Sequence, residues 1–287
     1  MSASRQPARL LAAALLAAIS LTATMASADA GGPEQAGVRT ALSDAGLLND
    51  PLALAGAVTT LGDVRITHHL RTSEPQIDVT WDAQDAAGRP VLATVRVARR
   101  ITGKLDIERA DAEGLARFAR KDVDDDAVRQ VTLRREGDRW RVSAMSAEVL
   151  ASRGGRTQLP LVDLNTHAVS SGHLSVLSDL DELAVLPQTC AVTQAGDVVR
   201  VFVSGVAKDA VVTVFANGRS YAAKSDGEAH FEAAVSLPGD ARLQSIGVTV
   251  YSRASVFDPS APADSRTWIL PILVGAPPAL GEQYFGS

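Results

Sequence analysis

From Gly62 onwards, apolar and polar residues alternate in one short segment after another. The alternation is clearest in residues 64–71, 77–82, 199–203 and 231–237. Because successive side chains of a strand point to opposite faces of a sheet, this period of two is typical of half-buried β-strands. Turn-forming residues separate the segments, as they do in antiparallel hairpins. The sequence therefore predicts a mainly β protein.

The residues that precede this region follow a helical spacing instead. Val38, Leu42 and Leu47 form one apolar stripe, and the helix that carries them is interrupted before a proline at position 51. A second short helix is expected over residues 51–62. A third is expected over residues 111–120, where two apolar residues lie three apart.

Two domains are expected. Helices ahead of a meandering sheet predict an α+β domain with an antiparallel curved sheet and N-terminal helices over residues 36–152. The polar, glycine-bearing stretch at 152–156 would end it. Over residues 156–276, several short strands with turn signals roughly every 8–12 residues are typical of an immunoglobulin-like β-sandwich. Asn217-Gly218 marks one of its hairpins, since both residues tolerate the positive φ of a tight turn.

Residues 1–28 have the features of a secretory signal peptide. Arg5 and Arg9 precede an apolar run over residues 10–23, and the small-residue sequence Ala26-Ser27-Ala28 follows. The run is shorter than the ~20 residues of a bilayer-spanning helix, so cleavage is expected rather than an N-terminal anchor. We therefore expect a secreted or periplasmic bacterial protein with no membrane span after signal removal.

Cys190 is the only cysteine in the sequence, which excludes a disulfide within the chain. Two alternatives remain for it. A small, buried apolar side chain is favoured over an intermolecular disulfide.

Charge and composition argue against a nucleic-acid partner. The formal net charge is −5, and no basic stripe interrupts the sequence. Aromatic residues make up only 4% of the chain, which leaves few platforms for base stacking.

The histidines do not form a metal-binding pattern. His68 and His69 are neighbours on a predicted strand and would point to opposite faces, with His68 on the apolar face. His167 and His173 lie six residues apart in a predicted loop, with Asp163 and Asp179 nearby. A zinc site needs three or four ligands in tetrahedral geometry, and this spacing matches no known set.

Two groups of aspartates were considered as sites. Asp122 and residues 124–126 could bind calcium, but the sequence lacks the central glycine and terminal glutamate of an EF-hand loop, so a solvated turn is expected. Asp78 and Asp82 could act as acid and base if they faced a pocket. The alternation places them on the exposed face instead.

Searches for a nucleophile or a phosphate loop find neither. Gly-x-Ser-x-Gly and Ser-x-x-Lys are absent from the sequence, and Gly154-Gly155 is not followed by Gly-Lys-Ser/Thr. No catalytic, cofactor-binding or metal-binding residue is therefore assigned, and no cofactor is expected.

Two segments resemble known families. The hairpin over residues 132–142, with Trp140 after a Glu136-Gly137-Asp138 turn, resembles the closing hairpin of ketosteroid-isomerase-like (cystatin-like) domains. Residues 189–275, with Ser225-Asp226-Gly227 and Leu237-Pro238, resemble bacterial immunoglobulin-like modules. The whole chain is similar to two-domain exported bacterial proteins. The first resemblance implies helices packed on a curved sheet, but no member of that family's catalytic set maps onto this sequence by motif.

These observations favour an exported, non-catalytic binding or structural protein of the bacterial envelope. A protein partner would bind at strand edges or loops of the sandwich, where an added strand can extend a sheet. The alternative is a small-ligand binder or an enzyme that uses a cavity in the first domain. That alternative requires a deep apolar pocket with buried carboxylates between helix and sheet.

Overall fold

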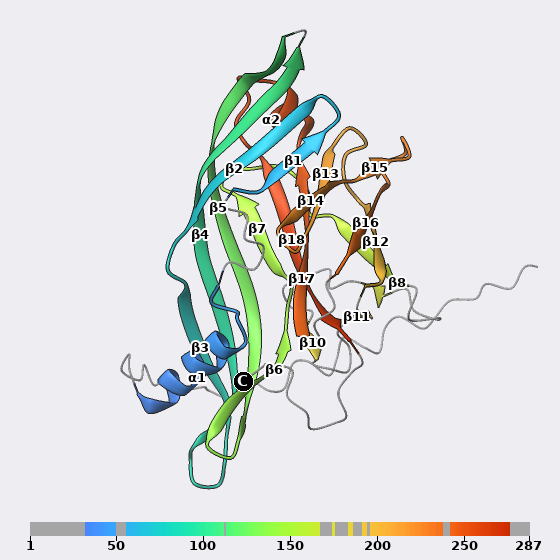
Figure 1. Ribbon diagram of the computed structural model, residues 1–287. Helices are drawn as coiled ribbons and strands as arrows, with labels where there is room; N and C mark the ends of the chain where they lie inside the picture. Colours follow the sequence, from blue (N-terminus) through green and yellow to red (C-terminus); the bar gives the residue numbers. More distant parts are fainter. Residues whose placement is uncertain are drawn as a thin grey trace, which may run out of the picture.

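The computed structural model describes residues 32–49, 56–111, 113–166, 174–175, 183–185, 191–193, 196–237 and 242–275. The described part is mainly β, as the alternation predicts, and its strands are largely antiparallel (Figure 1). The helices are α1 (Pro33–Asp44) and the short α2 (Arg253–Phe257). Neither helix has the length and apolar character needed to cross a bilayer, and the described residues contain no other candidate.

The strands of the first half of the chain range in length from four to 23 residues. They are β1 (Val58–Leu61), β2 (Val64–Thr72), β3 (Gln76–Gln84), β4 (Pro90–Asp111), β5 (Gly114–Glu136), β6 (Arg139–Met145) and β7 (Glu148–Ser152). Those of the second half are β8 (Leu161–Thr166), β9 (Leu174–Ser175), β10 (Ala184–Val185), β11 (Ala191–Thr193), β12 (Val198–Ser204), β13 (Val211–Ala216), β14 (Arg219–Ala222), β15 (Lys224–Ser225), β16 (Phe231–Ser236), β17 (Arg242–Tyr251) and β18 (Ser265–Val274).

One large sheet, here called the curled sheet, runs in the order β1-β2-β4-β5-β7-β18-β17-β13-β14. β3 pairs with β4, and β6 pairs with β5. The sheet is nearly barrel-like because its two ends meet: β1 lies beside β14, and Thr59 Oγ1 is 2.6 Å from Ser220 Oγ. No backbone ladder joins β1 to β14 among the described residues.

The second sheet, β15-β16-β12-β8-β9, packs on the outside of the curled sheet. β17 and β18 contribute alternate side chains to two separate apolar cores, one between the two sheets and one inside the curled sheet. Val248 of β17 and Leu270 of β18 are buried against the second sheet, whereas Thr249 and Ile269 point to the inside of the curled sheet. The region therefore has a sandwich-like packing, with β17 and β18 buried on both faces.

The two helices pack near opposite ends of the long strands of the curled sheet (Figure 1). Val38 and Leu42 of α1 are buried against Val95 and Leu133 near one end. At the other end, Val256 of α2 joins the apolar core. α2 is held by a buried lysine on β5, because Lys121 Nζ donates to the carbonyl oxygens of Asp258 at 2.6 Å and Ala261 at 2.7 Å.

Two predicted helices are wrong. Residues 111–120 form the far end of the β4–β5 hairpin, in which Ala110 pairs with Leu115. Leu115 is 53% exposed and only Phe118 of the apparent helical stripe is partly buried, so strand pairing with β4 determines the conformation. Val58–Leu61, expected in the second helix, is strand β1, while residues 50–55 lie outside the described residues.

β4 runs through Gly103 without interruption. Gly103 has a φ of +151°, and a Cβ at this position would lie 2.1 Å from the carbonyl oxygen of His69. Glycine here permits close approach of β2 to β4 rather than a turn.

The curled sheet continues across the predicted domain boundary. β7 pairs with β18, with Leu150 opposite Thr267, so strands from both sides of residues 152–156 share one sheet. The division into an α+β domain and an immunoglobulin-like domain therefore stays a prediction. The expected signal peptide, residues 1–28, lies outside the described residues.

Candidate functional site

The structure separates His68 from His69, as the alternation predicts. His68 is 3% exposed inside the curled sheet, whereas the His69 side chain is half-exposed, with Nε2 3.3 Å from Asp106 on the outer face. Both His68 nitrogens have partners. Nδ1–H donates to the carbonyl oxygen of Ala57 at 3.1 Å, and Nε2 accepts from the hydroxyl of Tyr251 at 2.8 Å. Burial lowers the pKa of His68, so the ring is neutral at physiological pH.

The acidic run is not the expected turn, because it lies in the middle of β5. Asp122, Asp124 and Asp126 point to the outer face. There they pair with Lys104, Arg100 and Arg153, respectively. These pairs across neighbouring strands explain why so many carboxylates are tolerated in one strand.

Asp125 is the exception in this run, since its side chain points inward and is only 7% exposed. Burial raises its pKa to about 6, although a hydrogen bond with the Ser152 side chain acts in the opposite direction. The sequence contains a signal for this inward orientation, namely the strict alternation of Val123, Asp125 and Ala127.

Asp78 and Asp82 lie on the exposed face of β3, as predicted. Asp78 is 3.6 Å from Arg96, and Asp82 accepts a hydrogen bond from the hydroxyl of Thr94 at 2.7 Å. No pocket brings the two carboxylates together among the described residues. Of the other candidates, Asp163 lies on β8, while His167, His173, Asp179 and Cys190 lie outside the described residues.

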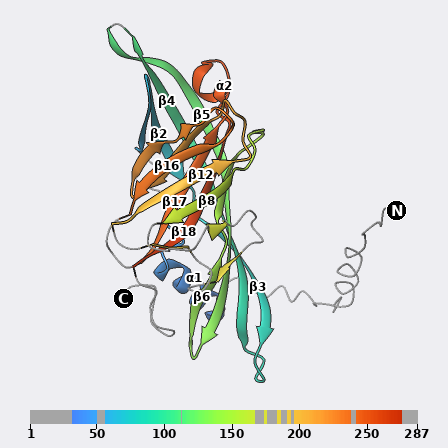
Figure 2. The ribbon, with the colours of Figure 1, turned by 90° about the vertical axis from the view of Figure 1, so that its right-hand side faces the viewer.

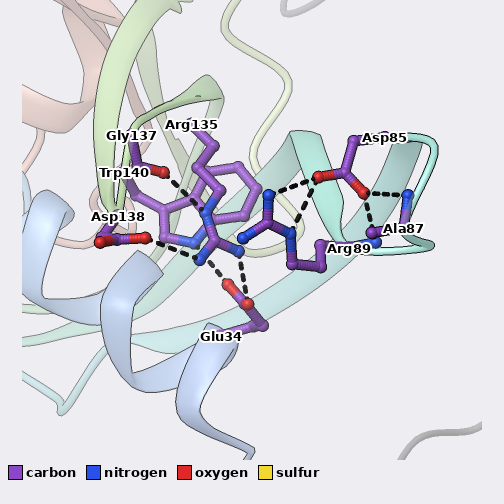
Figure 3. A network of polar contacts seen from close by, with 8 residues as sticks. All are labelled: Glu34, Asp85, Ala87, Arg89, Arg135, Gly137, Asp138 and Trp140. Atoms are coloured by element: carbon purple, nitrogen blue, oxygen red, sulfur yellow. Dashed lines mark hydrogen bonds and ion pairs between the residues drawn. The ribbon is translucent and has the colours of Figure 1, made fainter.

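At the helix–sheet interface, α1 makes direct side-chain contacts with the β5–β6 hairpin. Glu34 at the start of α1 accepts hydrogen bonds from Arg135 and, at 3.0 Å, from Nε1 of Trp140 (Figure 3). Arg135 also donates to the carbonyl oxygen of Gly137 at 3.1 Å. Burial raises the pKa of the Glu34 carboxyl, but these hydrogen bonds more than offset it and hold the pKa below its usual value. α1 is thus fixed to the β5–β6 hairpin.

A buried charge cluster, missed in the sequence, lies deeper inside the curled sheet. Glu148 of β7 is 3.1 Å from Arg99 Nε and 3.4 Å from Arg129 Nη2, and all three side chains are at most 3% exposed. Arg99 also donates to the carbonyl oxygens of Leu47 and Asn49, which closes the end of α1 over the sheet. Arg99 of this cluster also lines a groove of about 640 Å³ beside β4.

The outer edge of β3 is a candidate surface for a protein partner. β3 pairs with β4 on one side, and among the described residues no strand pairs with its other side (Figure 2). Its inward side chains, Ile77, Val79 and Trp81, are only half-buried, although Trp81 packs on Trp140 with ring centroids 5.6 Å apart.

An open groove of about 550 Å³ follows this edge. It is lined by α1 on one side and by the start of β3 on the other. The lining residues are Gln35, Ala36, Arg39, Pro75, Gln76, Ile77 and Asp78. A strand added to β3 would therefore place alternate side chains between the sheet and α1.

The edges of the second sheet, where a partner was expected, are shorter. β15 has two residues, and the carbonyl oxygen of Ser236 at the end of β16 already accepts a hydrogen bond from the Asn217 side chain at 3.2 Å. A groove of about 700 Å³ lies beside these strands, next to Phe202 and Tyr221. The strand edge beside this groove, formed by β15 and β16, offers fewer free backbone groups than the edge of β3 does.

Comparison with protein-family models gives no match, and comparison with curated proteins gives no relative of significant similarity.

Proposed function

We propose that this chain is an exported, non-catalytic binding protein of the bacterial envelope that takes up an extended peptide segment along the outer edge of β3. The free nine-residue edge of β3 carries the proposal. A strand added there gains backbone hydrogen bonds, while pockets for alternate side chains supply specificity.

The sequence of β3 leaves this edge open. Natural edge strands are commonly protected by lysine, proline or short length, and β3 contains no lysine or proline. Its inward face exposes part of Ile77, Val79 and Trp81, and a bound segment would bury that apolar surface.

The outward face of β3 indicates the chemistry of the partner. Asp78 and Asp82 alternate with Thr80 on this face, and the Asp78 side chain is 72% exposed. Opposite charges on neighbouring strands stabilise their pairing by roughly 0.2–1 kcal/mol each. The proposed ligand is therefore an extended segment in which apolar residues alternate with lysine or arginine.

The experiment is a selection of nine-residue peptides displayed on phage, with the full chain as bait. Enriched peptides are expected to alternate apolar and basic residues, and to lose binding to an Ile77→Lys variant, which places a charge in the groove. Leu115→Lys introduces the same charge at an exposed leucine of the distant β4–β5 hairpin and should leave binding unchanged. Peptides that bind the Ile77→Lys variant as well as the unchanged chain would refute the proposal.

A further inference from the structure

A small internal chamber lies in the curled sheet, between the β2–β4–β5 wall and the β17–β18 wall. Its volume of about 20 Å³ corresponds to one water-sized species. It is lined by His68, Leu70, Ile101, Leu105, Val123, Asp125, Leu150, Phe215, Thr249, Tyr251, Ser265 and Thr267. Half of these residues are apolar, and the polar ones supply mainly oxygen atoms.

The chamber contains one carboxyl group without a charged partner. Asp125 Oδ1 is buried and has no hydrogen-bond partner, although the Ser152 side chain has a hydrogen bond with the carboxyl group. Arg266 lies near enough for its positive charge to act on Asp125, but the two residues form no ion pair. His68 does not fill this role, because its two nitrogens are already engaged by Ala57 and Tyr251 and the ring is neutral. An isolated buried carboxylate is costly unless a positive charge or a proton compensates it.

The neighbouring hydroxyls offer lone pairs to the same chamber. The hydroxyl hydrogen of Tyr251 is used in the bond to His68, so its oxygen can act only as an acceptor or ligand elsewhere. Thr249 and Thr267 hydrogen-bond each other at 2.7 Å, which leaves lone pairs on both oxygens. Ser265 adds a further oxygen at the rim. The chamber is therefore rich in acceptors and carries one negative charge.

We infer that the chamber binds a single small monovalent cation, of the size of sodium or potassium, with Asp125 as the charged ligand and the Tyr251, Thr249, Thr267 and Ser265 oxygens around it. A neutral water molecule would fill the space but would bring no positive charge into contact with the carboxylate. A calcium ion prefers six to eight oxygens and usually several carboxylates, so one carboxylate favours a monovalent ion.

The test is thermal unfolding of the full chain at pH 8 in sodium, potassium or choline chloride at equal ionic strength. Choline is too large for the chamber and serves as the reference salt. A bound ion should raise the unfolding midpoint by about 4 °C per tenfold increase in alkali ion above its dissociation constant. The effect should disappear in Asp125→Asn and persist in Asp122→Asn, whose side chain lies on the outer face of the same strand.

A second measurement covers the case in which Asp125→Asn does not fold. In the unchanged chain, protons compete with the ion for Asp125, so the alkali-ion effect should fade between pH 8 and pH 5. Equal midpoints in alkali and choline salts, or an alkali effect that survives at pH 5 or in Asp125→Asn, would overturn the inference.

Discussion

The hydroxyl of Tyr251 donates a 2.8 Å hydrogen bond to Nε2 of His68, and so connects β17 to β2 across the inside of the curled sheet. The two residues are 183 positions apart in the chain. This contact links the two halves of the sequence between side chains that are both at most 3% exposed.

Removing this hydroxyl should destabilise the fold. Tyr251→Phe leaves Nε2 of His68 buried without a donor, which costs roughly 1–3 kcal/mol. Chemical denaturation should therefore show a lower free energy of unfolding. Tyr221→Phe, at the groove beside β16, is the matched control and should change it little. Equal losses of unfolding free energy in the two variants would show that the hydrogen bond to His68 does not stabilise the fold.

The stability of the protein should depend on the protonation of Asp125. Burial raises its pKa from 3.8 to about 6, so the folded state favours the protonated acid. The corresponding stability is present below pH 3.8 and is lost as the pH rises through about 6, by about 3 kcal/mol in total. We would measure the free energy of unfolding of the unchanged chain and of Asp125→Asn in choline chloride from pH 4 to pH 8. Relative to the variant, the unchanged chain should lose stability as the pH rises. A constant difference would contradict it.

The buried cluster of Arg99, Arg129 and Glu148 should tolerate change poorly. Glu148→Gln removes the only carboxylate that contacts the two guanidinium groups among the described residues. The expected loss is about 3–5 kcal/mol of unfolding free energy, because two buried positive charges then face each other. Glu232→Gln removes an exposed partner of Arg200 and should cost less than about 1 kcal/mol. A similar small effect for Glu148→Gln would contradict the account of the cluster.

The attachment of α1 should depend on its first turn. Glu34→Gln weakens the bonds to Arg135 and Trp140, so the backbone amides of α1 should exchange hydrogen faster while those of β17 do not. Asp44→Asn, at the exposed end of the same helix, is the control. Unchanged exchange in α1 would show that the apolar contacts of Val38 and Leu42 alone hold the helix.

Local patterns in the sequence predict most of the strands. They fail where pairing with another strand determines the conformation of a segment. The alternation over residues 64–71 predicts both the strand and the burial of His68, and the Glu136-Gly137-Asp138 turn before Trp140 predicts the β5–β6 hairpin. The segment over residues 111–120 has a helical spacing, but its pairing with β4 outweighs that local preference.

The candidate sites were harder to predict for the same reason. The acidic run is evident in the sequence, but its two faces follow from the alternation only when the run is recognised as the middle of one long strand. Neither the chamber at Asp125 nor the cluster at Glu148 has a local motif. Each forms only when strands that are distant in the sequence come together, as β7 and β18 do by pairing. The open edge of β3 also depends on the order of strands, which no single segment encodes.

Hydrogen exchange of the full chain, with and without a selected alternating peptide, tests the central claim most directly. If the peptide adds to β3, amides within residues 76–82 should exchange at least about tenfold more slowly in the complex, while those of β16 remain unchanged. Unchanged exchange in β3 while the peptide is bound, or protection at β16 instead, would contradict the account.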